Sequence, residues 1–97
     1  MWVVVCYDVN TETNEGKRRL RRVAQVCKNY GQRVQKSVFE CEVNEMQFDR
    51  LRRSLLKEVE LEQDNLRLYR LTEPRDSRVE EYGSTKTVLF NEETLMV

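Results

Sequence analysis

Residues 1–10 read MWVVVCYDVN, and this stretch decides the fold. From Trp2 to Tyr7 every residue is β-branched, aromatic or a thiol, and turn-forming Asn10 and Thr11 come just beyond. Such a run predicts a strand that is buried on both faces. In so short a chain, helices can cover only one face, so we expect a second copy of the protein to cover the other. A two-fold axis near this strand would bring two Asp8 carboxylates together.

The composition narrows the functional classes. A chain of 97 residues forms one domain with a modest core, to which dimerisation would add burial. The 17 basic and 17 acidic residues cancel, and the absence of histidine excludes a Ser-His or Cys-His nucleophile pair.

Cys6, Cys27 and Cys41 lack CxxC spacing and occupy apolar positions, which predicts buried free thiols in a reducing compartment. Because the apolar run is too short for a signal peptide or a membrane span, we expect a cytoplasmic protein without a membrane partner.

The middle of the chain alternates between helical and extended patterns. Residues 10–16 are polar and predict a loop, and residues 17–30 predict a helix that ends at Gly31 in a left-handed conformation. The apolar stripe of this helix comprises Leu20, Val23, Ala24, Cys27 and Tyr30. Extended structure follows over residues 32–43, where a strand around residues 33–35 is expected to pair with the next strand through a tight turn near Lys36-Ser37.

A second helix and a fourth strand complete the pattern. Asn44 with Gln47 three residues later predicts a capped helix start, and Asp49 can support Arg53 one turn on. The apolar stripe of this helix comprises Phe48, Leu51, Leu55 and Val59. Residues 60–64 form an acidic linker, and residues 65–71 predict a strand.

The order strand, helix, strand, strand, helix, strand indicates an α+β, ferredoxin-like βαββαβ fold. Both helices then cover one face of a four-stranded antiparallel sheet, and the apolar open face predicts a homodimer packed sheet to sheet. Residues 79–83 predict an extra C-terminal strand, which could join the edge of the partner's sheet. We therefore divide the chain into a ferredoxin-like domain, 1–83, and a C-terminal tail, 84–97.

Basic residues are concentrated in one part of this neutral chain. Between Gly16 and Phe39 there is no acidic residue, and the basic residues there are Lys17, Arg18, Arg19, Arg21, Arg22, Lys28, Arg33 and Lys36. Such a block suits a phosphate backbone, although a solvated helix face explains it equally well. Gln35 and Ser37 either contact phosphate or shape the turn.

Asp8 is the first charge in the chain and stands at the end of the first strand. A carboxylate in this position is commonly a turn-stabilising residue. The alternative is a Mg²⁺ ligand, since magnesium takes one or two carboxylates together with waters and substrate phosphate. Two Asp8 residues across a dimer axis would supply that set, and the metal would support phosphodiester hydrolysis without a histidine.

Four segments together resemble a known family. They are Tyr7-Asp8-Val9 closing the first apolar strand, the basic helix, QRVQKSVFE over residues 32–40, and Tyr69-Arg70-Leu71. In this order, over residues 1–83, they resemble the small CRISPR-associated endoribonucleases, the dimeric partners of the CRISPR integrase in spacer acquisition.

The resemblance implies a ferredoxin-like homodimer, a divalent metal at Asp8, and cleavage of RNA or DNA as found in some members. It also implies a non-catalytic role in holding duplex DNA between integrase dimers. Within the pattern of the family, Asp8 carries the metal, and the positions expected to assist it are occupied by Tyr7, Arg19, Arg33 and Phe39. Two functions follow: a Mg²⁺-dependent endonuclease of the CRISPR adaptation machinery, or a dimeric DNA-binding scaffold that does not need Asp8.

Overall fold

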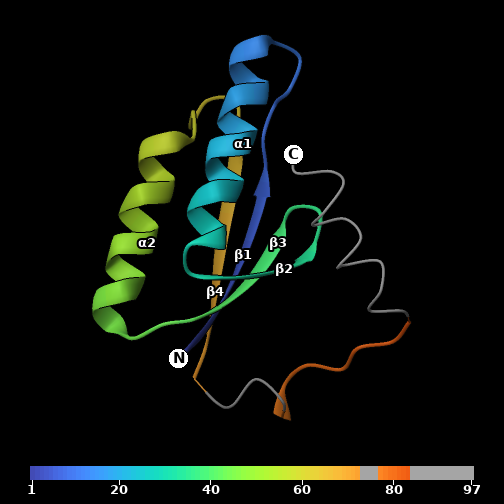
Figure 1. The fold of residues 1–97 in the computed structure, drawn as a ribbon, viewed down its shortest axis with the longest axis vertical. Helices are drawn as coiled ribbons and strands as arrows, with labels where there is room; N and C mark the ends of the chain where they lie inside the picture. Colours follow the sequence, from blue (N-terminus) through green and yellow to red (C-terminus); the bar gives the residue numbers. More distant parts are fainter. Residues whose placement is uncertain (73–76, 84–97) are drawn as a thin grey trace.

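The computed structural model describes residues 1–72 and 77–83, and it has the predicted βαββαβ order (Figure 1). The elements are β1 (Trp2–Asp8), α1 (Asn14–Lys28), β2 (Gly31–Gln35), β3 (Val38–Glu42), α2 (Glu45–Glu58) and β4 (Asn65–Leu71). The strands form one antiparallel sheet in the order β2-β3-β1-β4, and Figure 1 shows α1 and α2 side by side on the same side of it. The ferredoxin-like fold is therefore confirmed.

The core lies between the helices and the sheet. In β1, Val3, Val5 and Tyr7 are buried in it, whereas Trp2 and Val4, which alternate with them, are only half-buried. Successive side chains of a strand point to opposite faces, so this pattern distinguishes a helix-covered face from an open one. The prediction that β1 is buried on both faces is correct for one face of the single chain.

The three cysteines are likewise divided between the core and the open face of the sheet. Cys27 and Cys41 are fully buried free thiols, as predicted, but Cys6 lies on the open face of the sheet and is only half-buried. Burial raises the pKa of Cys27 to about 12 and that of Cys41 to about 11, so both thiols remain protonated and unreactive at neutral pH.

The first helix starts earlier than its sequence pattern suggested. Thr13 is the N-cap, and its Oγ1 accepts a hydrogen bond from Gly16 N at 3.0 Å. Gly16 lies in the first turn, and a glycine is required there because any Cβ would collide with the carbonyl oxygen of Asn10. The interpretation of residues 14–16 as loop was therefore wrong, since turn-forming residue types also suit a capped first helical turn.

The second helix matches its prediction closely. Asn44 and Gln47 form a reciprocal capping box, with Asn44 Oδ1 accepting from Gln47 N at 2.8 Å. Asp49 contacts Arg53 at 2.7 Å, as expected for residues one turn apart.

One other local prediction fails. Gly31 does not end α1 in a left-handed conformation; it begins β2, and the only glycine with positive φ in the described ranges is Gly83. Residues 79–83 form no strand in this single chain, and their addition to the edge of a partner's sheet stays a prediction. The predicted tail, 84–97, lies outside the described residues. Within the described ranges, neither helix has the length and apolar character required to cross a bilayer.

Candidate functional site

Asp8 ends β1 on the side of the sheet opposite the helices. It is exposed and pairs in register with Asn65 of β4. Its carboxylate takes part in no hydrogen bond or ion pair with any residue that the structure describes. The turn-stabilising bond belongs instead to Asn10, whose Oδ1 accepts from Glu12 N at 2.9 Å. Asp8 is therefore not the turn-stabilising residue, and both of its oxygens are available to a ligand.

An open cleft of about 490 Å³ lies beside Asp8. Asp8, Glu12 and Glu62 are exposed acids in its lining, so the cleft favours a cation and repels a bare phosphate. Among the described residues, no three acidic or thiol side chains are grouped so as to hold a metal ion. Of the three exposed acids only Asp8 stands at a strand end, and one carboxylate per chain would suit a magnesium site completed by other oxygen ligands.

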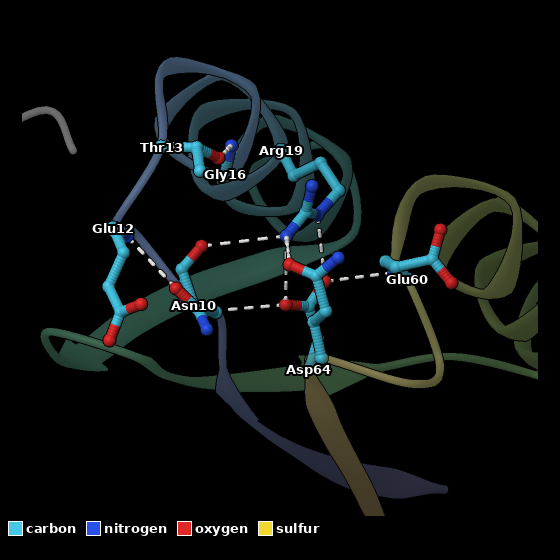
Figure 2. A network of polar contacts seen from close by, with 8 residues as sticks. Asn10, Glu12, Thr13, Gly16, Arg19, Glu60 and Asp64 are labelled. Atoms are coloured by element: carbon cyan, nitrogen blue, oxygen red, sulfur yellow. Dashed lines mark hydrogen bonds and ion pairs between the residues drawn. The ribbon is translucent and has the colours of Figure 1, made fainter.

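Asp64 forms a buried ion pair that pattern reasoning missed. Arg19 Nε donates to Asp64 Oδ2 at 2.9 Å, and the backbone N–H of Glu60 donates to the same oxygen at 2.8 Å. Figure 2 shows Asp64 between Arg19 and the loop that carries Glu60. The Asp64 side chain is 0% exposed and that of Arg19 is 12% exposed. Because Asp64 lies in a segment that looks like an acidic linker, and its partner is 45 residues away, no local pattern marks it.

The contacts of Asp64 keep it ionised. Burial alone would raise the pKa of its carboxyl, but hydrogen bonds from Arg19 and from the backbone N–H groups of Glu60 and Asn10 lower it, and the net shift is downward. The hydrogen bond to Asp64 also raises the pKa of Arg19. Both members of the pair are therefore charged at neutral pH.

The basic surface consists mainly of one face of α1. Lys17, Arg18, Arg21 and Arg22 are exposed and form no ion pair within the described ranges. Lys36 is also exposed, at the turn between β2 and β3. These five residues remain available to a phosphate backbone. We call the four residues on α1 the basic face.

Arg19 and Arg33 depart from the basic surface on which the sequence placed them. Arg19 turns toward Asp64 instead of solvent. Arg33 is only 1% exposed, with its Cζ 5.1 Å from the centroid of the Phe39 ring. Lys28 is half-buried. Counting basic residues along the sequence could not separate these side chains from the exposed ones, because burial depends on the tertiary structure.

Tyr7, Arg33 and Phe39 lie together, but away from Asp8. The rings of Tyr7 and Phe39 stack with centroids 6.3 Å apart, and all three side chains are buried. Burial raises the pKa of Tyr7 to about 12 despite the opposing effect of Arg33. Since neighbouring residues of a strand point to opposite faces, Tyr7 lies in the core while Asp8 faces outward. These residues therefore support the strand that carries Asp8 and do not border the cleft.

The turn residues have a structural role in this chain. Ser37 is half-buried, and its carbonyl accepts a hydrogen bond from Tyr7 N at 3.1 Å. The carbonyl of Lys36 accepts from the Tyr7 hydroxyl at 3.5 Å. The turn between β2 and β3 is thus fixed to the end of β1.

Comparison with known proteins gives consistent matches. The family model described as CRISPR associated protein Cas2 matches residues 1–79. CRISPR-associated endoribonuclease Cas2 1 of Moorella thermoacetica is 55% identical over 91 residues, covering 94% of this chain and 95% of that protein. CRISPR-associated endonuclease Cas2 of Halalkalibacterium halodurans is 44% identical over 88 residues, covering 91% and 92%. The crystal structure of Streptococcus pyogenes Cas2 at pH 6.5 superposes with a TM-score of 0.76 at 47% identity, covering 86% of this chain and all of that one.

Proposed function

This chain belongs to the CRISPR associated protein Cas2 family, and we propose on that premise that it is a Mg²⁺-dependent endonuclease of a CRISPR system. It would act with the integrase in spacer acquisition. The observation that carries the proposal is Asp8, an exposed carboxylate without a partner in the described residues, at a strand end beside an acidic cleft. Relatives of this chain are named endoribonuclease or endonuclease, which supports hydrolysis of phosphodiester bonds.

A second copy of the chain would complete the site. The open face of the sheet carries half-buried Trp2, Val4 and Cys6 on its central strand β1. A central row of apolar side chains favours association, and a symmetric pair places the same residues of both chains near one axis. Asp8 continues the same alternating row, so the two carboxylates would approach each other at that interface.

Each group in the chain then has a definite task. The basic face of α1 binds the phosphate backbone through its guanidinium and ammonium groups. Asp8 is the carboxylate ligand for magnesium, and Glu12 and Glu62 keep phosphate out of the cleft unless a cation is present. A bound magnesium ion supplies Lewis-acid stabilisation of charge at the scissile phosphate.

The test is Asp8→Asn, which preserves size and removes the negative charge. We expect cleavage of RNA or DNA to fall by at least about 100-fold, the size of effect that losing electrostatic transition-state stabilisation produces. Duplex affinity and oligomeric state should not change. Asp49→Asn, which removes a charge on α2, is the matched control and should cleave normally. Cleavage by Asp8→Asn at the wild-type rate, in protein freed of contaminating nuclease, would refute the catalytic role.

A second candidate function is a dimeric DNA-binding scaffold for the integrase. It is favoured by the basic face, whose four exposed cations could bind duplex whether or not Asp8 is present. If wild-type protein showed no metal-dependent cleavage but kept duplex binding and spacer acquisition, the scaffold would be the one candidate function that remains.

A further inference from the structure

Asn10, two residues after Asp8, is held through its backbone N–H, its backbone carbonyl and its side-chain Oδ1 (Figure 2). Its N–H donates to Asp64 Oδ1 at 3.0 Å, and its carbonyl accepts from Arg19 Nη2 at 3.5 Å. Its side-chain Oδ1 accepts from Glu12 N, as described above. Two of these three bonds come from the Arg19–Asp64 pair, so the path of the chain just beyond Asp8 depends on that pair.

The same carboxylate closes the end of the β1–β4 ladder. Asp8 and Asn65 are the last residues paired in register, and Asp64 directly precedes Asn65. The bond from Asn10 N to Asp64 Oδ1 thus links the two chain segments beyond the last backbone pair, through a side chain where the backbone ladder stops. Val9, between Asp8 and Asn10, is 8% exposed and packs into the core. Asp8 is therefore anchored by strand pairing on one side and by Asp64 on the other.

The Arg19–Asp64 pair also connects Asp8 to the basic face. Arg19 is on α1, immediately after Arg18 and two residues before Arg21, but its guanidinium turns inward to Asp64. Because the Asp64 side chain is 0% exposed, its charge-assisted hydrogen bonds are shielded from water. One ion pair thus ties the phosphate-binding helix to the strand end that carries the proposed metal ligand.

We infer that Asp64, together with Arg19, is a positioning residue that fixes the place of the Asp8 carboxylate relative to the basic face of α1. This inference rests on the proposed function. Asp64 also lines the cleft, but its side chain is 0% exposed and its two oxygens accept hydrogen bonds from Asn10, Arg19 and Glu60, so it acts through Asn10 and the strand end instead of touching substrate.

The experiment compares Asp64→Ala with Asp49→Ala in the full chain. Asp49 is the matched control because it also forms two arginine ion pairs, to Arg52 and Arg53, but on α2 away from Asp8. We expect Asp64→Ala to lower kcat for cleavage at least about tenfold while KM and duplex affinity stay near wild type. Arg19→Lys, which can still offer Asp64 one charged donor, should recover part of that loss relative to Arg19→Ala. Asp49→Ala should leave kcat unchanged.

A second measurement does not depend on catalysis. Amide hydrogen exchange at Asn10 should become faster in Asp64→Ala than in wild type, while exchange in α2 stays the same. Equal exchange at Asn10 in the two proteins, or a folded Asp64→Ala variant with wild-type kcat, would overturn the inference. If wild-type protein showed no metal-dependent cleavage, the proposed function would fail, and the exchange data would still decide whether Asp64 holds the chain at Asp8.

Discussion

At the scale of a single residue, the close packing of β2 against β3 explains why position 31 is a glycine. Any Cβ at this position would collide with the carbonyl oxygen of Glu40 and crowd Cys41 on β3. We therefore expect Gly31→Ala to lower the free energy of unfolding by about 1–3 kcal/mol, the usual cost of overpacking. The adjacent exposed Gln32→Ala should change it by less than about 0.5 kcal/mol. Urea unfolding at one fixed protein concentration measures both values; equal stability of the two variants would show that the strands can separate at little cost.

At the scale of an element, α1 divides its charges between solvent and the interior. Arg18, Arg21 and Arg22 face outward, while Arg19 in the same run pairs with Asp64. Reversal of the three outward residues to glutamate should weaken duplex binding and reduce the slope of log K against log salt by about 2–3, since each lost phosphate contact removes about 0.9. Arg50→Glu with Lys57→Glu, exposed positions on α2, is the control and should leave that slope unchanged. Salt titrations of duplex affinity that gave the same loss for both variants would refute a specific role of α1.

At the scale of the whole molecule, the open face of the sheet decides whether two Asp8 carboxylates can meet. Val4 lies in the middle of the half-buried row on this face. Val4→Lys would bury an unpaired charge in the proposed interface, at a cost of about 3–5 kcal/mol, and so raise the dimer dissociation constant by at least about 100-fold. Gln25→Lys on the exposed side of α1 should leave association unchanged. Sedimentation velocity measures both, and a Val4→Lys protein that associated like wild type would exclude the sheet-to-sheet arrangement.

Features that depend on residues close together in the sequence were predictable, and features that depend on distant segments were not. The strand and helix order, the second helix start and the exposed end of β1 were all predictable, because each depends on residues a few positions apart. Asn44 and Gln47, for example, are three residues apart and form their capping box within one turn. The unbroken apolar run from Trp2 to Tyr7 likewise predicted that Asp8 stands at the end of a buried strand.

The sequence by itself thus determined the ferredoxin-like fold and the position of Asp8 at the end of its first strand, through hydrophobic periodicity and helix capping. Only the tertiary structure decided which charged residues are free. Arg19 and Arg33 have the same residue type as their exposed neighbours, yet one meets Asp64 and the other packs on Phe39. The physical reason is that burial and ion pairing depend on segments far apart in the chain, such as the 45 residues between Arg19 and Asp64, and no local pattern records those contacts.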